Sequence, residues 1–372
     1  MKTTVLILGG GLAGLYAGRL LHAAGIDFRL VEARMRLGGR ILTTDQAGSP
    51  TEDGFDLGPS WFWPEMQPAM RRLVDDLGLA IFPQCNDGDV VFQRMSRESP
   101  QRYRTTHQEP QSMRIVGGTG ALVAALGAAI PREHLLLGTR ALHLELAPAG
   151  VMLRISAPAG AEELLVAEQV IAALPPRLLA GLSFTPAIDP ATLQRWSATP
   201  TWMAPHAKFF AIYPRAFWRQ AGLSGTAQSM AGPLAEIHDA TTSSGKAALF
   251  GFPALSSQMR SALGEPGLRQ ACLEQFALLF GAEALRPQAT LFKDWAADPL
   301  TATVDDQIAG AHPDGSSAPW VTGAWRERLS LAGSETSSTE PGYMAGAVSA
   351  AERAVEEVCR RLNPGAEQND RS

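Results

Sequence analysis

The fold of this chain is decided by the stretch Leu6-Ile7-Leu8-Gly9-Gly10-Gly11-Leu12-Ala13-Gly14-Leu15-Tyr16-Ala17-Gly18-Arg19-Leu20-Leu21. An apolar strand runs into the motif Gly9-x-Gly11-x-x-Gly14, and an apolar-faced helix leads out of it. In such a turn the first glycine permits a tight bend, the second lets the backbone approach a pyrophosphate, and the third lets the helix pack on the strand. The helix N-terminus then offers N–H groups and partial positive charge to phosphates. The stretch predicts a dinucleotide site on a Rossmann-like βαβ unit.

The next predicted strand supplies the acid that such a site needs. The short apolar run Phe28-Arg29-Leu30-Val31-Glu32 closes on Glu32, about where a dinucleotide-binding fold places an acceptor for a ribose hydroxyl. The plain alternative is a glycine-rich turn in an α/β domain that holds no ligand. That alternative gives no reason for a carboxylate at this point, so we expect a bound dinucleotide.

Composition and charge exclude several other kinds of protein. Of the 372 residues, 45% are hydrophobic and 19% are charged, and the formal net charge is −5; these values are typical of a globular enzyme. The lack of a basic block argues against nucleic acid or an anionic membrane surface as a partner. Cys85, Cys272 and Cys359 are too few and too scattered for a disulfide framework or a metal motif.

The N-terminal segment bears on localisation. The apolar run from Val5 to Leu15 resembles a signal peptide, but it has one preceding basic residue, lacks a convincing cleavage site and contains the glycine turn. No other run of about 18 apolar residues predicts a membrane span. We therefore expect a cytoplasmic protein whose cysteines serve packing in a reducing compartment.

Periodicity predicts an α/β chain. Helical spacing marks four segments, Met66–Leu77, Ala121–Ile130, Gly267–Gly281 and Gly342–Leu362. Short apolar or alternating runs predict strands at Leu135–Leu137, Ala141–Leu146, Val151–Ile155, Val170–Leu174, His206–Tyr213, Ala247–Phe252 and Ala289–Trp295. The polar segment Asn86–Gln111 predicts a loop or a short hairpin.

Segments typical of a nucleotide-binding domain stand at both ends and in the middle of the chain. A nicotinamide dehydrogenase usually keeps its Rossmann half contiguous, so this interleaving favours FAD, a longer molecule that touches segments far apart in sequence. We predict a discontinuous FAD-binding domain of 1–64, 112–183 and 318–365, a smaller α+β substrate domain of 65–111 and 184–317, and a disordered tail of 366–372.

Five segments carry a family resemblance. They are the glycine turn, Glu32-Ala33-Arg34-x-Arg36-x-Gly38-Gly39-Arg40, Asp56-Leu57-Gly58-Pro59-Ser60-Trp61, Ala172-Ala173-Leu174-Pro175-Pro176, and Leu331-Ala332-Gly333-Ser334-Glu335-Thr336 with Gly342-Tyr343-Met344-x-Gly346-Ala347. In this order, over most of the chain, they resemble the flavin-containing monoamine oxidase family, within a wider FAD-binding group that includes polyamine oxidases and carotenoid desaturases. The set is very specific for FAD and less specific for amine oxidation.

The resemblance implies which residues line the cofactor. Arg34 and Arg40 would serve the pyrophosphate as fixed cations, or else are solvated loop charges. Glu335 and Thr336 would lie beside the ribityl and pyrophosphate part, the alternative for Glu335 being a helix N-cap without a ligand. The last helix would direct its positive end at N1 and the C2 carbonyl of reduced flavin. The predicted cofactor-binding set is Gly9, Gly11, Leu12, Ala13, Gly14, Glu32, Ala33, Arg34, Gly38, Gly39, Arg40, Gly58, Pro59, Ser60, Trp61, Ala141, Leu174, Gly333, Glu335, Gly342, Tyr343 and Met344.

Lys208 is the first predicted catalytic residue. It stands in the apolar strand His206-Ala207-Lys208-Phe209-Phe210-Ala211-Ile212-Tyr213, where burying a lysine is costly without a partner or a task. The segment resembles the amine oxidase strand whose lysine holds a water against flavin N5, which is again followed by a Phe-Trp pair, here Phe217-Trp218. The alternative places Lys208 on a solvent face. Lys293 is a weaker candidate that we expect to be exposed.

The chain also departs from the family pattern. The family flanks the amine's path with two aromatic rings, of which Tyr343 matches the second and is the other predicted catalytic residue. The first ring would fall near Val304 or Asp305, where the chain has no aromatic residue. The cysteine that carries FAD covalently in some members is also missing there, which implies non-covalent FAD.

The segments expected to enclose the substrate are shorter in this chain than in the family. The segment before Gly117 leaves little room for a helical substrate lid, which implies a more open pocket. Trp61 and Trp63 either replace the lost aromatic surface or pack in the core. Glu340 and Asp305 either bring carboxylates towards a cationic substrate, such as a diamine or amino alcohol, or are solvated loop acids.

These observations together predict an FAD-dependent oxidase acting on a C–N bond. A small-molecule amine would be oxidised to an imine that hydrolyses to a carbonyl compound, and dioxygen would reoxidise the flavin with formation of hydrogen peroxide. One alternative is an FAD-dependent desaturase or dehydrogenase with an acceptor other than oxygen. Another is a non-catalytic flavoprotein that acts through a partner.

Overall fold

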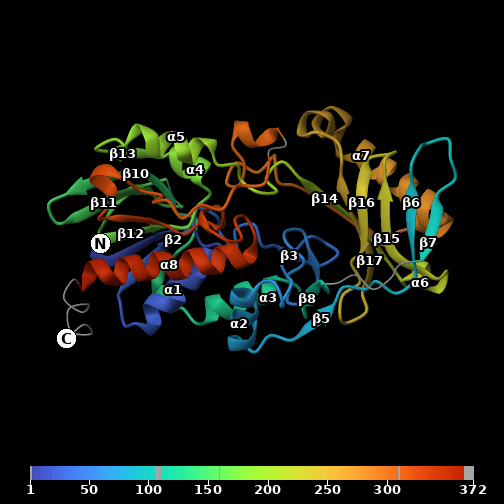
Figure 1. Cartoon of the computed structure of the whole chain (residues 1–372), viewed down its shortest axis with the longest axis horizontal. Coiled ribbons are helices and arrows are strands. Elements are labelled where there is room, and N and C mark those ends of the chain that lie inside the picture. The colour runs from blue at the N-terminus through green and yellow to red at the C-terminus, as the bar shows by residue number, and fades with distance from the viewer. Residues whose placement is uncertain (1, 105–109, 159, 309–310, 364–372) are drawn as a thin grey trace. The chain divides into compact units, whose positions relative to one another are not determined.

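A computed structural model describes residues 2–104, 110–158, 160–308 and 311–363, and its contacts divide the chain into two compact units (Figure 1). Unit 1 comprises Met1–Arg40, Leu122–Trp202 and Gly310–Ser372, and unit 2 comprises Ile41–Ala121 and Met203–Ala309. The predicted disordered tail lies outside the described residues. Each unit is described by itself.

Unit 1 is built on a mixed sheet with a parallel centre. The strand order is β13-β10-β11-β12-β1-β2-β9, and β19 also pairs with β12. Strand β1 runs parallel to both β2 and β12, while β10, β11 and β12 form an antiparallel meander. The strands are β1 (Lys2–Leu8), β2 (Phe28–Val31), β9 (Leu135–Leu136), β10 (Arg140–Ala147), β11 (Gly150–Ser156), β12 (Glu162–Ala172), β13 (Ser183–Thr185) and β19 (Leu329–Leu331).

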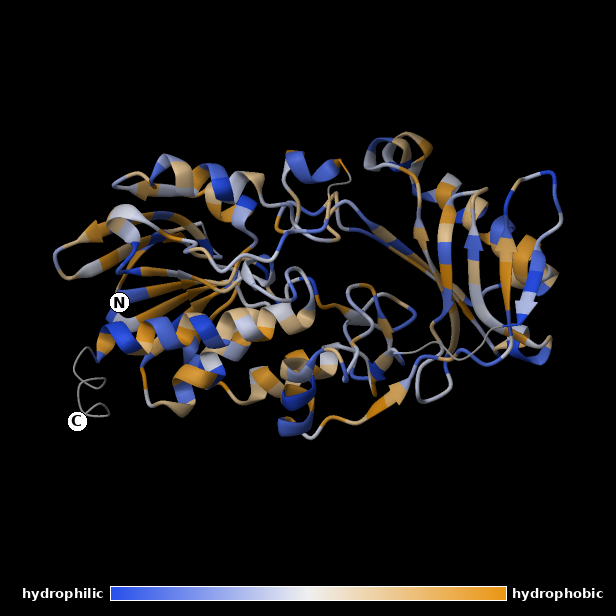
Figure 2. Ribbon diagram, viewed as in Figure 1, coloured by the Kyte–Doolittle hydropathy of each residue, from blue (hydrophilic) through white to orange (hydrophobic). Residues whose placement is uncertain are grey.

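Helices cover this sheet. They are α1 (Leu12–Ala23), α3 (Gly120–Ala128), α4 (Pro176–Ala180), α5 (Pro190–Ala198) and α8 (Met344–Leu362), of which α3 begins at the border between the units. Figure 1 shows α8 lying beside α1, with which it is in contact. On α8, the helix predicted over Gly342–Leu362, the expected apolar stripe is buried at Val348, Ala351, Val355 and Val358, whereas its last member, Leu362, is half-buried. The parallel strands are predominantly apolar, as Figure 2 shows, because both faces of a covered parallel sheet are buried.

Unit 2 is built on a seven-stranded sheet of order β18-β14-β17-β16-β15-β6-β7. Its strands are β6 (Asp89–Gln93), β7 (Gln101–Arg104), β14 (Ala207–Tyr213), β15 (Leu223–Ser229), β16 (Leu234–Asp239), β17 (Ala247–Pro253) and β18 (Ala289–Asp294). Two small sheets, β3 (Thr43–Thr44) with β4 (Phe55–Asp56) and β5 (Ile81–Pro83) with β8 (Met113–Ile115), complete the strands. The helices are α2 (Pro68–Asp76), α6 (Phe217–Gln220) and α7 (Ser257–Phe280).

The mixed α/β fold class is confirmed, and the elements differ from the expectations in detail. The polar segment before Gln111 contains the hairpin of β6 and β7. Helix α7 begins ten residues before the predicted Gly267 because two helices meet at a kink, where Gly264 has φ of 72°. Strands β15 and β16 were not predicted at all.

The contact units follow borders other than those of the predicted domains. Residues 41–64 and 112–121, assigned above to the FAD-binding domain, pack within unit 2, whereas 184–202 and the described residues of 310–317 pack within unit 1. The domains were assigned by expected cofactor contact, so that assignment remains a prediction. Across the described residues, no helix combines the length and apolar character needed to cross a bilayer.

Candidate active site

In unit 1 the glycine turn has the geometry that its sequence predicts. Gly9 follows β1 with φ of +103°, a conformation that a side chain would strain. An ideal Cβ on Gly14 would lie 1.9 Å from the carbonyl oxygen of Gly9, so only glycine lets α1 approach the turn. Gly11 forms a parallel bridge with Gly38, and the Gly38 N–H donates to the Gly10 carbonyl at 2.8 Å. The loop after Glu32 is thereby held against the turn.

Glu32 is buried beside this turn. The side chain is 6% exposed, and its carboxylate accepts the Gly10 N–H at 2.7 Å and the Arg34 N–H at 2.7 Å. Each carboxylate oxygen accepts one of these bonds, so each keeps a lone pair for a further donor. The structure therefore positions Glu32 as an acceptor next to the start of α1.

The residues present fit the ADP end of FAD. Helix α1 begins at Leu12 after the N-cap Gly11, and no side chain caps it in the described structure. An ideal Cβ on Gly11 would meet only the backbone of Gly38 and Gly39, at 3.9 and 4.0 Å. Glycine backbone rather than side chains therefore surrounds the helix N-terminus, which leaves room for a pyrophosphate to approach the backbone N–H groups.

Arg40 and Glu335 form an ion pair within unit 1, in which Glu335 is fully buried and Arg40 is half-buried. Arg40 Nη1 donates to Glu335 Oε1 at 2.6 Å and Nη2 donates to Oε2 at 3.2 Å, a bidentate geometry. Glu335 is unexposed, and Arg40 also binds Ser334 Oγ and the Trp202 carbonyl. The alternative of a solvated loop charge is therefore wrong for Arg40. Arg34 is half-buried as well; its N–H donates to Glu32, and its carbonyl accepts the Gly138 N–H.

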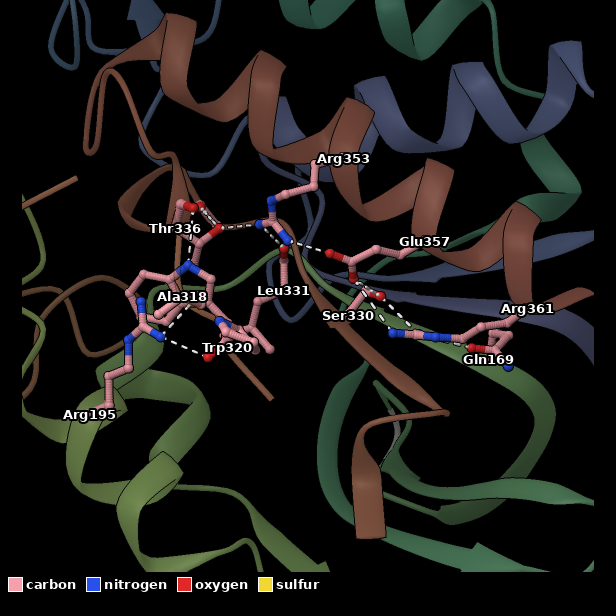
Figure 3. Close-up of polar contacts among 12 residues, drawn as sticks. Gln169, Arg195, Ala318, Trp320, Ser330, Leu331, Thr336, Arg353, Glu357 and Arg361 are labelled. Carbon is pink, nitrogen blue, oxygen red and sulfur yellow. Dashed lines mark hydrogen bonds and ion pairs between the residues drawn. The ribbon is translucent and has the colours of Figure 1, made fainter. Parts of the chain in front are cut away.

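Arg353 of α8 fixes the turn that carries Glu335. Its Nη2 donates to the Leu331 carbonyl at 2.8 Å and to Thr336 Oγ1 at 3.1 Å, and its Nη1 donates to Glu357 at 2.8 Å (Figure 3). Trp320 Nε1 donates to the Thr336 carbonyl at 3.1 Å from the other side. The sequence did not single out Arg353, because on a helix it reads as one of several exposed charges.

Tyr343 is the N-cap residue of α8, which no side chain caps in the described structure. Its ring is 38% exposed and lies 5.2 Å from the ring of His312, with the planes inclined at 35°. His312 in turn lies 4.3 Å from the Trp202 ring. The structure thus gives Tyr343 a planar neighbour, His312, which the sequence analysis did not anticipate.

Five further predicted cofactor residues of unit 1 fall into three groups. Leu174 and Gly333 lie together close to Gly9, since an ideal Cβ on Gly9 would lie 2.9 Å from Leu174 Cδ2, and one on Gly333 would lie 2.3 Å from the Leu174 carbonyl oxygen. Gly342 has φ of +83° and Met344 begins α8. Ala141 lies on β10 and packs against the core of the unit.

In unit 2, Lys208 is buried rather than solvent-facing. All seven residues of β14 are buried, and Lys208 is 5% exposed. Its ammonium donates to three acceptors, Asp56 O at 3.1 Å, Gly58 O at 2.5 Å and Ser60 Oγ at 2.8 Å. These bonds use every N–H that an ammonium has. The predicted cofactor residues Gly58 and Ser60 are thus immediate partners of Lys208.

Two opposing effects act on the charge of Lys208. The pKa of Lys208 is lowered from 10.5 to about 7, because burial and the nearby Arg114 lower it by more than the Asp56 carboxylate raises it. The faces of aromatic rings add cation–π attraction, with Phe250 at 4.6 Å from Nζ and Trp61 at 5.9 Å. The pKa therefore lies where the proton can leave or return near neutral pH.

The loop that holds Lys208 is itself anchored. Asp56 Oδ1 accepts hydrogen bonds from Thr43 Oγ1 at 2.6 Å and from the Thr119 N–H at 2.8 Å. Trp295 Nε1 donates to the Leu57 carbonyl at 2.9 Å, and Pro59 accepts from Thr119 Oγ1 at 3.0 Å. Lys293, the cross-strand partner of Lys208, is 24% exposed and forms an ion pair with Asp298 at 2.9 Å. Lys293 is thus partly exposed, and Lys208 is the better candidate.

Unit 2 contains a cavity of about 140 Å³, and its wall includes Trp61, whose ring centre lies 5.9 Å from Lys208 Nζ. Trp61 and Trp63 line it, which places both on a cavity wall rather than wholly in a core. Glu236 and His238 of β16 line it as well, and neither was singled out from the sequence. Their strand escaped notice because a register irregularity between Leu234 and Glu236 breaks its alternation.

The two acids that the sequence offered for substrate binding differ in exposure. Asp305 is exposed, as expected for a solvated loop acid. Glu340 is half-buried, its Oε1 has no partner among the described residues, and burial raises the pKa of its carboxyl group. Whether either contacts a substrate remains a prediction.

Comparison with known proteins identifies the family. The model of the flavin containing amine oxidoreductases matches residues 12–104 and 94–359. The flavin-containing amine oxidase B of Mus musculus is 23% identical over 97% of this chain and 87% of that protein. An L-amino acid dehydrogenase of Synechocystis is 27% identical over 68% of this chain and 52% of that protein.

Solved structures agree with this assignment at the level of the fold. The structure of a putrescine oxidase with putrescine bound matches with a TM-score of 0.80 at 18% identity, over 96% of this chain and 99% of that chain. The predicted flavoenzyme resemblance is confirmed: this chain belongs to the flavin containing amine oxidoreductase family and is an FAD-dependent amine-oxidising enzyme.

Proposed function

We propose that this protein binds FAD without a covalent link and oxidises the C–N bond of a small amine, with dioxygen as the final electron acceptor. The observation that carries the proposal is the buried Lys208 ammonium, held by three acceptors from the loop of Asp56, Gly58 and Ser60. A lysine buried at this cost, in a member of a flavin amine oxidoreductase family, is better explained by a task than by stability.

The chain's residues divide the work of cofactor binding. The N–H groups at the start of α1 would hold the pyrophosphate, and Glu32 would accept a ribose hydroxyl. The Arg40–Glu335 pair would present a fixed donor and acceptor to the middle of the cofactor. The uncapped N-terminus of α8, which begins at Met344, would stabilise negative charge on the reduced ring.

FAD, when bound, supplies the chemistry: it takes a hydride equivalent from the amine α-carbon and passes two electrons to dioxygen, giving hydrogen peroxide. The released imine takes up water and breaks into a carbonyl compound and ammonia or a smaller amine. Tyr343 would orient the neutral amine, and Lys208 would exchange one of its three acceptors for a water and hold that water near flavin N5. No general base is assigned, because hydride leaves from a neutral amine without one.

Stopped-flow kinetics of Lys208→Met test this assignment. We expect slower flavin reoxidation by oxygen, slower release of imine product, or both, while Lys293→Met, which changes the neighbouring lysine of the sheet, leaves them at wild-type rates. If Lys208→Met leaves flavin reduction, flavin reoxidation and imine release all at wild-type rates, Lys208 has no role at the flavin.

One observation favours a different electron acceptor. A relative that covers two thirds of this chain is named a dehydrogenase rather than an oxidase. Mixing the amine-reduced enzyme with oxygen separates the two functions, because an oxidase reoxidises fast and a dehydrogenase does not. A third alternative, a non-catalytic flavoprotein, is excluded if any amine bleaches the flavin absorbance under anaerobic conditions.

We also propose a cytoplasmic location. The described cysteines Cys85, Cys272 and Cys359 are all free, which supports a reducing compartment. Fractionation of the native host with an assay for peroxide formation tests this location.

A further inference from the structure

We propose that Asp56 and Arg114 are opposing positioning residues for Lys208: the Asp56 carboxylate holds the proton on the Lys208 ammonium, and the Arg114 guanidinium favours its release. Neither residue has to touch a substrate or the cofactor to act in this way. The inference rests on the proposed function, since it concerns the group proposed to act at the flavin. It goes further by naming the residues that determine the pH range in which that group carries charge.

The carboxylate of Asp56 is buried and is hydrogen-bonded on one side only. The residue is 2% exposed, and its Oδ1 accepts hydrogen bonds from Thr43 Oγ1 at 2.6 Å, the Thr119 N–H at 2.8 Å and Thr119 Oγ1 at 2.9 Å. Its Oδ2 is buried as well and has no hydrogen-bond partner among the described residues. A buried anionic oxygen without a donor is costly, so this oxygen depends on positive charge nearby.

Two buried cations supply that positive charge. Lys208 Nζ donates to the backbone carbonyl of Asp56 itself at 3.1 Å, which holds the ammonium next to the residue that carries the carboxylate. Arg114 of β8 is 5% exposed, and its guanidinium donates to the carbonyls of Thr241 at 2.8 Å and Ala240 at 3.4 Å. These carbonyls are neutral acceptors, so they do not compensate the charge of Arg114.

One apolar cluster of unit 2 brings the three charges together. It contains Ala240, whose carbonyl Arg114 binds, and Phe250, whose ring centre lies 4.6 Å from Lys208 Nζ. Strand β4, which carries the carboxylate, contributes Phe55 to the same cluster. Charges that border a buried apolar cluster are screened much less than charges in water, so they act on one another strongly.

The other ionisable groups around Lys208 contribute little net charge. Two ion pairs lie on the neighbouring strand and helix, Lys293–Asp298 at 2.9 Å and Asp294–Arg260 at 2.7 Å. Strand β17 contributes aromatic rings, which are neutral. Burial lowers the pKa of His206, two residues before Lys208, so this ring is neutral at pH 7. The charge state of Lys208 therefore depends mainly on its burial and on Asp56 and Arg114.

The charges of the cluster sum differently in its two protonation states. When Lys208 is protonated, two cations share one anion. After Lys208 loses one proton, the charges of Asp56 and Arg114 balance. Burial favours the balanced state, because an uncompensated charge in the interior is costly. This agrees with the lowered pKa of Lys208, about 7, to which Asp56 and Arg114 contribute in opposite directions.

Nuclear magnetic resonance of the oxidised holoenzyme tests the inference without turnover. The chain contains four lysines, Lys2, Lys208, Lys246 and Lys293. Labelling lysine with ¹³C therefore gives one set of side-chain signals per lysine, and Lys208→Met identifies the set of Lys208. We expect Asp56→Asn to lower the titration midpoint of Lys208 by about one pH unit. Arg114→Gln should raise it by a smaller amount, because Arg114 has the weaker effect.

The variants are chosen to change charge and little else. Asparagine at position 56 keeps the oxygen that accepts all the hydrogen bonds of Oδ1 and replaces only the unbonded Oδ2. Asp53→Asn is the matched control, because Asp53 stands just before β4 and is paired with Lys246 at 2.9 Å. This control should alter the titration of Lys246 and leave that of Lys208 unchanged. Damage to folding does not produce shifts of one midpoint in opposite directions.

The outcomes separate this inference from the proposed function. The pH at which the rate of flavin reoxidation changes should move with the titration midpoint of Lys208. If the midpoint shifts as expected and the reoxidation rate does not follow it, the proposed role of Lys208 fails and the inference about its neighbours stands. If Asp56→Asn and Arg114→Gln leave the midpoint at its wild-type value, or shift it in the same direction, the inference is overturned.

Discussion

Replacing Lys208 should change how the stability of the protein depends on pH. Burial lowers its pKa from 10.5 to about 7. Between these values the unfolded chain binds a proton that the folded chain has released, so the free energy of unfolding rises with pH. Below pH 7 both states are charged and above about pH 10.5 both are neutral, so the effect is confined to that window.

The size of the effect follows from the shift. Between pH 7.5 and 9.5 nearly one proton separates the two states, which is worth roughly 2.5 kcal/mol over this interval at about 1.4 kcal/mol per pH unit. In Lys208→Met this contribution is absent. The absolute stability is less informative, because methionine removes the desolvation cost but leaves three acceptors without their donor, at about 1 kcal/mol each.

Urea unfolding followed by tryptophan fluorescence, at saturating FAD and at several pH values, measures the effect. The quantity to compare is the difference between wild type and Lys208→Met, in which groups common to both proteins cancel, among them Cys272, whose pKa burial raises to about 12. Lys293→Met is the control, and its free energy of unfolding should change with pH as that of wild type does. If the free energy of unfolding of Lys208→Met changes with pH as that of wild type does from pH 7.5 to 9.5, Lys208 does not lose its proton on burial and the electrostatic reasoning is refuted.

Two further predictions concern unit 1. Gly14→Ala would place a Cβ 1.9 Å from the Gly9 carbonyl oxygen, so we expect FAD affinity to fall at least about 10-fold, as measured by flavin absorbance per chain during titration. In the control Gly181→Ala the nearest atom would lie 3.4 Å from the new Cβ, so this variant should bind FAD normally. Equal FAD affinity in both variants would contradict the close approach of α1 to the turn. Glu335→Gln should lower the free energy of unfolding by about 2 kcal/mol, because it removes the charge partner of the half-buried Arg40. Denaturation of the FAD-free protein measures this change. A loss below about 1 kcal/mol would assign the pair to cofactor binding rather than to stability.

Local features of the chain could be predicted because local rules govern them. The turn at Gly9 and Gly14 follows from backbone geometry and steric exclusion within a few residues, and the alternating or apolar runs of β1, β10 and β14 follow from strand periodicity. Lys208 stood out because a cation in an apolar strand conflicts with its surroundings. The family resemblance then extended these local signals to the FAD-binding fold.

Only the tertiary structure decided which side chains pair with one another in the candidate site. Arg40 and Glu335 are separated by 295 positions, and nothing in either segment marks the other as its partner. Glu236 and His238 stand two residues apart, but the irregular register of β16 hid their strand, and the indole of Trp61 reaches them from another part of the chain. The sequence by itself determined where the backbone can bend and which segments prefer burial, since those depend on neighbouring residues. Which charges meet depends on packing between distant segments, and that packing determines the electrostatics of the candidate site.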